Sequence, residues 1–412
     1  MFLHKITPSY DTTKVSSRRQ RHAAGRVLLC GASSISGFHN FGDDLYTDIY
    51  VDWLRHLLPD SDISMLTFHG LSKGTGGWAS QFEQADALLF IGGGYFGEPD
   101  HPGMSIFRRQ LRLLHWAVRN YRLYGGAFHA ARRHGVPHAV IGVGFGPIRA
   151  GFFRRCAVRV LREARVCALR DPESARYAKQ YGVQRDDLRV HVDGVLSLKT
   201  EELPPVATAA RDALCTSPQT FRIGLNLNSL SVAHWQHSQA IVRLILDLQR
   251  CVPPETPTSL YFLHDQKIDG QHPRNKRAAE SFIKSHFPQI TVLPFRGHWE
   301  MAGTLAAMHV VVTTKLHVGV TSRALSVPVL SIPAHQKTPR FYRFIGEQDF
   351  CIPAGKLAHL ELPAAFRAMM NDWSPGKRYP VSADARRSAE HNRTLLESFI
   401  SELPLKGRQL VA

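Results

Sequence analysis

Eleven short apolar runs, each separated from the next by a stretch with helical spacing, constrain the fold of this 412-residue chain most strongly. Each run is rich in Val, Ile, Leu or Phe and is continuous rather than alternating, which is typical of strands in a parallel sheet covered on both faces. Strands that alternate with helices favour βαβ units. The predicted strands are 26–32, 62–68, 86–91, 138–143, 165–170, 189–192, 221–227, 258–264, 290–295, 309–314 and 327–332.

A Pro-, Ala- and Thr-rich passage at 203–218 divides these strands into two groups. The pattern therefore predicts an α/β protein with two Rossmann-like domains facing a cleft, at 25–205 and 219–375. Residues 1–24 lack hydrophobic periodicity and are expected to form a flexible basic tail, and 376–412 are expected to supply a helix that packs back. Ligands of such sheets bind at the carboxyl ends of the strands and between the halves.

Two glycine-rich loops directly follow predicted strands, at 92–97 and 142–147. The first has the G-x-G-x-x-G spacing of a dinucleotide site, but it leads into loop residues instead of a helix. No acidic residue occurs between Asp100 and Glu163, where the ribose-binding acid would lie, so the sequence argues against that site. These glycines either form tight turns or let a ligand approach the backbone; on the second interpretation the cleft residues are Gly92, Gly93, Gly94, Gly144 and Gly146.

Polar side chains follow two further strands of the first half. Asp43 or Asp44 is expected to cap the helix that begins after the first strand, and Asn40 and Asp43 are also candidates for the cleft. Arg170 ends a later predicted strand. Its guanidinium either binds a carboxylate or phosphate in the cleft or pairs with Asp193 at the end of the next strand.

The second half carries a cationic cluster. Lys315 and His317 follow strand 309–314 and, read as its extension, lie on one face. A helix that opens near Gly319 would attract an anion with its N-terminus, and Lys337 follows the neighbouring strand. The cluster favours an anion-binding site, although a histidine satisfied within the core is the alternative for His317.

Several classes of site have no support in the sequence. The six cysteines form no C-x-x-C pair, which favours a reducing, cytoplasmic setting without structural zinc. No zinc-binding histidine motif lies near acidic residues, so no metal and no cofactor are expected. The nucleophile-elbow and P-loop motifs do not occur. An uncharged apolar run long enough to cross a membrane is missing, and a secretory signal is not expected.

The formal charge of +17 is concentrated in two places. Residues 1–26 carry a net +5, and 101–165 hold thirteen arginines and one acid, a net +12. Within 104–123, a stripe expected to face the core contains Phe107, Leu111, Leu114, Val118 and Tyr121. A basic stripe lies one position further on and contains Arg108, Arg112, His115, Arg119 and Arg122.

The basic stripe is either a solvated face or the binding surface for an anionic partner. The absence of acids favours the partner: a lipid-diphosphate-linked acceptor, an anionic membrane surface or an acidic polysaccharide. Nucleic acid is disfavoured, because no recognised nucleic-acid module or interleaved aromatic residues occur.

In order along the chain, these segments resemble the polysaccharide pyruvyl transferase family over most of residues 30–350. The matching segments are Asn40-x-Gly42-Asp43, Ala85-Asp86 leading to Gly92-Gly93-Gly94, Gly144-x-Gly146-Pro147, Arg170-Asp171-x-x-Ser174, Asp193, Lys315-Leu316-His317, Ser326-Val327-Pro328 and Lys337. The resemblance implies a fold similar to GT-B glycosyltransferases. It also implies transfer of an enolpyruvyl unit from phosphoenolpyruvate, the co-substrate, to sugar hydroxyls of an exopolysaccharide or its lipid-linked precursor, giving a pyruvate ketal.

The resemblance also implies roles for individual residues. An Arg-Leu-His segment and the arginine of the Arg-Asp motif hold the donor in that family, and these map onto Lys315, Leu316, His317 and Arg170. Lys315 departs from the family pattern, because lysine keeps the charge but loses the two-pronged geometry. Lys337 would add a third cation, and we expect His317 to be the general acid or base, since its ordinary pKa of roughly 6.5 suits either role.

Two other functions remain open at this stage. A GT-B glycosyltransferase would need an acid to hold the ribose of a nucleotide sugar, and Glu300 is available in the second half. A non-catalytic binder of acidic polymer would explain the lysine at position 315.

Overall fold

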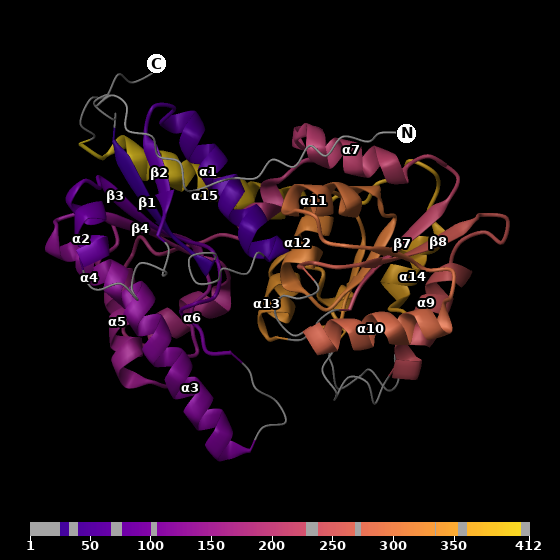
Figure 1. The fold of residues 1–412 in the computed structure, drawn as a ribbon, viewed down its shortest axis with the longest axis horizontal. Coiled ribbons are helices and arrows are strands. Elements are labelled where there is room, and N and C mark those ends of the chain that lie inside the picture. Colours follow the sequence, from indigo (N-terminus) through magenta and orange to yellow (C-terminus); the bar gives the residue numbers. More distant parts are fainter. Residues whose placement is uncertain are drawn as a thin grey trace.

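The computed structural model describes residues 25–32, 40–66, 76–99, 105–227, 238–267, 273–333, 335–352 and 361–404. The expected basic tail at 1–24 lies outside these residues. The described chain forms two parallel sheets that lie side by side, each with helices packed around it (Figure 1). Each of the eleven strands falls within one of the predicted apolar runs, so the α/β prediction is confirmed.

The first sheet has the strand order β2-β1-β3-β4-β5-β6, and every pairing is parallel. All residues of β3 and β4 are buried, as expected for central strands with helices on both faces. The strands are β1 Arg26–Cys30, β2 Asp62–Met65, β3 Ala87–Ile91, β4 His138–Val143, β5 Val166–Leu169 and β6 Arg189–Val190.

The second sheet has the order β11-β10-β7-β8-β9 and is also wholly parallel. Its order reverses at β7, between β10 and β8, which is the arrangement that opens a ligand crevice at the carboxyl ends of strands. The strands are β7 Phe221–Asn226, β8 Thr258–Leu263, β9 Thr291–Leu293, β10 Val310–Thr313 and β11 Val329–Ser331.

Helices connect the strands in both halves. Those of the first half are α1 Phe41–Leu57, α2 Gly76–Glu83, α3 Ile106–Asn120, a π-helical turn η3 Tyr121–Gly125, α4 Gly126–Arg133, α5 Gly151–Glu163, α6 Pro172–Gln180 and the 3₁₀ turns η4 Gly194–Ser197 and η5 Thr200–Glu202. The remaining helices are α7 Pro205–Leu214, α9 Ser238–Arg250, α10 Pro273–His286, α11 His298–Ala307, α12 Leu316–Ala324, α13 Lys337–Phe344, η6 Gln348–Phe350, α14 Ala364–Asn371 and α15 Ala383–Ser401. No helix among the described residues is both long and apolar enough to cross a bilayer.

The N-terminal cap of α1 differs from the prediction. Asn40, rather than Asp43 or Asp44, is the capping residue, and its side-chain oxygen accepts a hydrogen bond from the Gly42 amide at 3.1 Å. The two aspartates lie in the first turn, where negative charge stabilises the positive end of the helix dipole. The helix therefore begins earlier than the sequence suggests, and Asn40 is fixed at its entrance.

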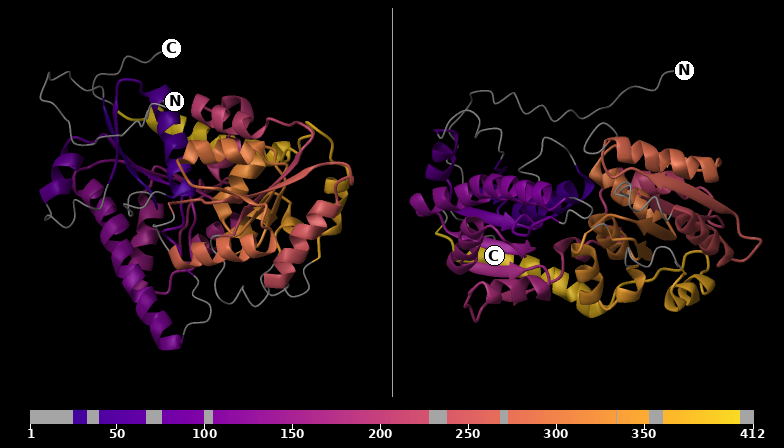
Figure 2. Two further views of the ribbon diagram at one scale, coloured as in Figure 1. Left: turned by 45° about the vertical axis from the view of Figure 1, so that its right-hand side comes forward. Right: turned by 90° about the horizontal axis from the view of Figure 1, so that it is seen from below.

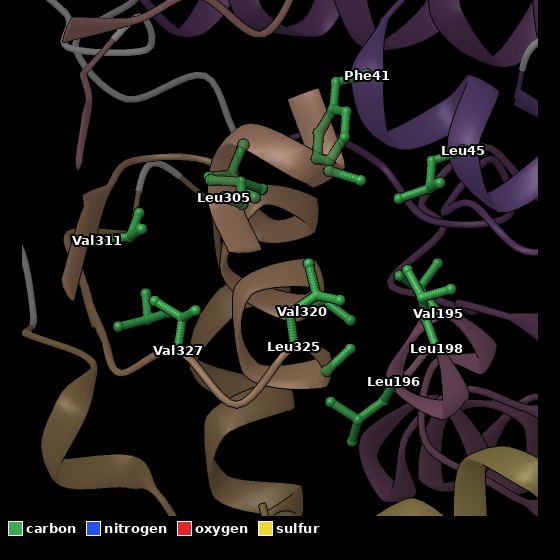
Figure 3. Packing of buried hydrophobic residues seen from close by; sticks show 14 of the residues in the cluster. Phe41, Leu45, Val195, Leu196, Leu198, Leu305, Val311, Val320, Leu325 and Val327 are labelled. Carbon is green, nitrogen blue, oxygen red and sulfur yellow. The ribbon is translucent and has the colours of Figure 1, made fainter. Parts of the chain in front are cut away.

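Helix α1 joins the two halves into one core. It packs against α11 and α12 of the second half, and one buried apolar cluster includes residues from both sheets. Figure 3 shows Phe41 and Leu45 of α1 with Leu305 of α11 and Val320 of α12 in this cluster. The chain after β8 also forms an antiparallel bridge with Asn40. The halves are consequently held together along one side of the space between them.

Helix α15 lies against the first half, beside α1, β4 and β5 (Figure 2). The Asn392 side chain donates to the Val192 carbonyl at 2.9 Å, and the Val192 amide donates to the Ser388 hydroxyl at 3.1 Å. The Pro-, Ala- and Thr-rich passage that separates the halves contains α7, which packs closely on α11. A β-carbon on Gly303 of α11 would lie 1.9 Å from the carbonyl oxygen of Ala207 in α7.

The core-facing stripe predicted for α3 is wrong. Four of its five side chains are exposed, among them 76% of Phe107 and 60% of Leu111, and only Val118 is half-buried. The buried residues are instead Leu113, Ala117 and Asn120, on another face of the helix. Periodicity identifies residues that share a face but does not say which face the fold covers.

Candidate functional site

A cavity of about 420 Å³ lies between the two halves. Its walls come from the loops after β1, β3, β5, β8, β10 and β11, which is where ligands of such sheets are expected. The residues predicted from the sequence that line it are Asn40, Asp43, Gly93, Gly94, Arg119, Arg170, Lys315, Leu316, His317 and Lys337.

The remaining predicted residues lie elsewhere. Gly144 and Gly146 line a second cavity of about 100 Å³ that shares Gly94, Arg170 and Lys337 with the first. Gly92 lines neither cavity and is covered by Tyr46, whose ring would lie 2.0 Å from a β-carbon at this position. Three of the predicted surface arginines are exposed and line neither cavity: Arg108, Arg112 and Arg122.

The segment from Lys315 to His317 is a helix start and not the strand extension predicted from the sequence. Strand β10 ends at Thr313, whose hydroxyl accepts a hydrogen bond from the Lys315 amide at 2.9 Å. Lys315 is the N-cap of α12, and Leu316 and His317 are in its first turn. The positive end of the α12 dipole therefore lies at the cavity wall and favours an anion there.

His317 and Arg170 come from opposite halves and meet at the carboxylate of Asp193. The Nε2 atom of His317 lies 3.6 Å from Oδ2 of Asp193, and Nη1 of Arg170 lies 3.7 Å from the same oxygen. Although burial alone would raise the pKa of Asp193, His317 and Arg170 hold it below its ordinary value. Arg170 therefore both pairs with Asp193 and lines the cavity. Its position agrees with each of the two interpretations given from the sequence, the ion pair and the place in the cleft.

Three glycines leave space for three functional side chains. A β-carbon on Gly42 would lie 2.0 Å from Nδ1 of His317. A β-carbon on Gly94 would lie 2.3 Å from Nζ of Lys337. A third, on Gly144, would lie 2.7 Å from Nη2 of Arg170. The space at these glycines is therefore occupied by cationic or ionisable side chains of the cavity.

The glycine loops also support one another. The Gly144 amide donates to the Gly93 carbonyl at 2.9 Å, and the Gly146 amide donates to the Phe96 carbonyl at 2.7 Å. Gly93 and Gly146 have positive φ angles of 72° and 63°, which favour glycine. These bonds continue the alignment of β3 and β4 beyond the strands and fix the wall that carries Gly94 and Gly144.

Lys337 is the first residue of α13 and reaches the cavity from the second half. Burial lowers the pKa of its ammonium group to about 8, and the positive charges of Arg170 and Arg340 act in the same direction. The nearby Asp43 carboxylate opposes this shift. A bound anion would relieve the repulsion among these cations, so the cluster is poised to accept negative charge.

Sequence reasoning missed Asp265 and His335. Asp265 is 2% exposed, and its Oδ2 lies 3.5 Å from Nζ of Lys315. Its backbone oxygen accepts a hydrogen bond from the Phe41 amide at 3.0 Å, across the boundary between the halves. Asp265 directly follows a predicted strand, which puts it at the carboxyl edge of the sheet. The sequence could therefore have identified it as a cavity residue. His335 also lines the cavity.

Glu300, the acid available for a nucleotide sugar, lies away from this cavity. It lines a different cavity of about 190 Å³ together with Arg296 and Thr304. Among the described residues, no group of three or more His, Cys, Asp or Glu is arranged to hold a metal ion. The main cavity instead combines cations from both halves with two histidines, His317 and His335, and the carboxylates of Asp43 and Asp265. This arrangement suits a small, multiply charged anion and proton transfer beside it.

Comparisons with known proteins agree with this architecture. The sequence profile of the family described as polysaccharide pyruvyl transferase matches residues 40–335. No curated protein sequence matches the chain significantly.

Several solved structures similar to this chain were determined with UDP or a UDP-sugar bound. HepE of Anabaena, solved in complex with UDP and glucose, is 16% identical with a TM-score of 0.52, over 92% of this chain and 98% of that one. UDP-GlcNAc 2-epimerase of Methanocaldococcus jannaschii, in complex with UDP-GlcNAc and UDP, is 11% identical with a TM-score of 0.50, over 90% and 99% of the two chains. At these identities the likeness concerns the fold alone, and it confirms the GT-B-like arrangement.

Proposed function

The chain belongs to the polysaccharide pyruvyl transferase family, and from that premise we propose that it transfers the enolpyruvyl unit of phosphoenolpyruvate to hydroxyls of a saccharide. The product would be a pyruvate ketal on an exopolysaccharide or on a lipid-diphosphate-linked oligosaccharide. Phosphoenolpyruvate is a co-substrate in this proposal, and no cofactor or metal takes part.

The convergence of cations from both halves on one cavity is the observation that carries the proposal. Arg170 enters from the first half, and Lys315 and Lys337 enter from the second. Phosphoenolpyruvate has a carboxylate and a phosphate close together, so it needs several cations around a small volume. The α12 N-terminus adds a further attraction for one of these anionic groups.

In the proposed reaction, the methylene carbon of the donor takes up a proton while positive charge develops at C2. One sugar hydroxyl then forms a C–O bond to C2 and loses its proton. Phosphate leaves with the electrons of its C–O bond and takes up a proton, and the second hydroxyl closes the ring with loss of its own proton. The atoms balance: donor and diol give ketal and inorganic phosphate.

His317 is the residue we assign to proton transfer. It lines the cavity, and its Nε2 atom lies 3.6 Å from Oδ2 of Asp193. Arg170 and Lys315 orient the donor by its charged groups, while Lys337 neutralises the leaving phosphate. Leu316 borders the same wall and limits access of water to the reacting carbon.

A cytoplasmic location is part of this proposal. All six cysteines are free thiols, and five of them are buried, which suits a reducing compartment.

A direct assay distinguishes this proposal from the two other functions. The protein is incubated with an oligosaccharide acceptor and either phosphoenolpyruvate or a panel of UDP-sugars, and inorganic phosphate, UDP and acceptor mass are followed. We expect phosphate release with phosphoenolpyruvate, together with an acceptor heavier by one pyruvate ketal. UDP release would support a glycosyltransferase instead. An acceptor retained on the protein without any turnover would support a non-catalytic binder.

A further inference from the structure

Helix α3 carries an apolar stripe that the described part of the chain leaves largely uncovered. Four of its members are exposed, 76% of Phe107, 60% of Leu111, 51% of Leu114 and 36% of Tyr121, the last in the turn η3 that follows α3, while Val118 is half-buried. Ile106 before them is 77% exposed. Only two other large hydrophobic side chains are exposed among the described residues. Scattered exposed apolar residues are ordinary, but a continuous row along one helix marks a contact surface.

A basic stripe runs beside this apolar row. Its five members each follow an apolar residue by one position, which places them about 100° further round the helix, and all are exposed: Arg108, Arg112, His115, Arg119 and Arg122. No acidic residue occurs between Asp100 and Glu163 to neutralise them. The exposed surface of α3 is therefore apolar along one line and positive along the next.

The position of α3 leaves this surface accessible. The helix projects from the first half, and its N-terminal part extends beyond the rest of the fold (Figures 1 and 2). Among the described residues, those of α3 that are buried lie toward its C-terminal end, at Leu113, Ala117 and Asn120. The two exposed stripes can consequently meet a broad flat partner without rearrangement of the helix.

We propose that α3 docks the protein on an anionic lipid bilayer. Phe107, Leu111 and Leu114 enter the boundary between headgroups and acyl chains, and the arginines beside them contact lipid phosphates. A helix that sets a strongly cationic face beside a narrow apolar one is the type that lies in the plane of such an interface. Each arginine near a negatively charged surface adds to the binding.

Charge also argues against a second copy of the chain as the occupant. An antiparallel pairing of two α3 helices through the apolar stripe would bring one basic stripe against the other. Like charges placed together across an interface weaken association. An anionic surface satisfies the apolar and the basic stripe at once.

Docking through α3 has a consequence for the cavity. Trp116, Arg119 and Asn120 on the C-terminal part of α3 line the cavity. The Asn120 side chain also donates to the Tyr95 carbonyl at 3.4 Å, beside the glycine loop after β3. The cavity thus opens next to the docked helix, where a lipid-linked saccharide would be presented. This consequence rests on the proposed function, whereas docking itself does not.

Vesicle flotation tests the docking without any substrate. The full chain is mixed with vesicles of phosphatidylcholine alone or with about one third phosphatidylglycerol, and the floated fraction is measured. We expect binding to the anionic vesicles only. The double variant Phe107→Ser/Leu111→Ser should lower the partition coefficient at least about tenfold, since it removes two inserted side chains.

A matched control and a depth probe complete the test. The variant Val206→Ser/Leu246→Ser removes two exposed apolar side chains from α7 and α9 and should float like the unaltered protein. A Phe107→Trp variant should show fluorescence quenching by lipids brominated along the acyl chain. Equal flotation of Phe107→Ser/Leu111→Ser and the unaltered protein would overturn the proposal. So would a dimer in sedimentation experiments that only this double variant dissociates.

Discussion

At the scale of single residues, the cavity depends on glycines, which have no side chain and so leave room for ionisable groups. Gly42, Gly94 and Gly144 each pack directly against an ionisable side chain. The His317 ring, the Lys337 ammonium and the Arg170 guanidinium occupy the volumes that β-carbons would fill. Close packing of this kind restricts the positions of these charged groups, even where one of their atoms has no hydrogen-bond partner.

Gly144→Ala should weaken donor binding with little change in the fold. The new methyl group would displace the Arg170 guanidinium, which lies 2.7 Å from its position. Loss of one charge-assisted contact corresponds to an increase in KM for phosphoenolpyruvate of about tenfold or more. Steady-state kinetics measure the effect. Gly151→Ala is the control, because its methyl group would approach only Arg155, at 3.6 Å, and an equal increase in KM there would contradict the explanation.

His317→Ala should lower kcat by about 10²–10⁴-fold, the usual range for loss of a general acid or base. KM for phosphoenolpyruvate should change much less, since the cations that hold the donor remain. Single-turnover and steady-state assays with saturating donor and acceptor measure both constants. The exposed His286→Ala on α10 serves as the control. Near-normal turnover in His317→Ala would remove this residue from the chemistry.

Ten of the residues that line the cavity, and the pairing of Arg170 with Asp193, were predictable from the sequence, but the other pairings were not. Arg170 and Lys315 follow predicted strands, and carboxyl ends of strands gather at one edge of a sheet. The contact of Lys315 with Asp265 joins loops after two strands that are not adjacent in the sequence. The packing of His317 on Gly42 joins opposite halves. Such contacts depend on how the two sheets face each other, which periodicity does not encode.

At the scale of secondary structure, the strands were easier to predict than the orientation of α3. A buried parallel strand is apolar throughout, so a continuous run identifies it without knowledge of its neighbours. An amphipathic helix with three distinct faces allows more than one assignment. The apolar face of α3 is the exposed one, and its packed face includes the polar Asn120.

Leu113→Ala and Leu111→Ala form a matched pair on α3. Leu113 is 7% exposed, so its truncation should lower the free energy of unfolding by about 2–4 kcal/mol through lost packing. Leu111 is 60% exposed, and its truncation should cost less than about 0.5 kcal/mol. Urea unfolding monitored by circular dichroism measures both. A larger loss of unfolding free energy in Leu111→Ala than in Leu113→Ala would instead support the core-facing stripe expected from the sequence.

Lys337→Met should stabilise the protein at pH 7 while weakening donor binding. Burial lowers the Lys337 pKa from 10.5 to about 8, so below pH 8 the folded state bears the full cost of a charged ammonium group. Between pH 8 and 10.5 the unfolded chain binds the proton that the folded chain has released, and the stability of the unaltered protein rises with pH.

The gain on removing this charge is on the order of 1–3 kcal/mol at pH 7 and should shrink above pH 8. Thermal unfolding of both proteins from pH 7 to 10, with kcat/KM for phosphoenolpyruvate measured in parallel, provides the test. A Lys337→Met protein that is less stable at pH 7 and binds the donor normally would contradict both the expected gain in stability and the expected loss of donor binding.

At the scale of the whole molecule, the site exists because two sheets face each other. Helix α1 and the bridge between Asn40 and Gln266 hold the halves together on one side of the cavity. Glu173 on α6 also forms ion pairs with Arg340 and Arg343 on α13, at 3.2 and 3.1 Å. These pairs hold the halves together near Lys337. The cations that line the cavity come from both halves, Arg119 and Arg170 from the first and Lys315 and Lys337 from the second.

Calorimetric titration of phosphoenolpyruvate tests most directly whether both halves bind one donor. The account predicts that the unaltered protein binds phosphoenolpyruvate and not UDP-glucose. Arg170→Ala in the first half and Lys315→Ala in the second should each weaken that binding about tenfold or more. Binding of UDP-glucose without binding of phosphoenolpyruvate, or donor binding that is unaffected by both substitutions, would contradict it.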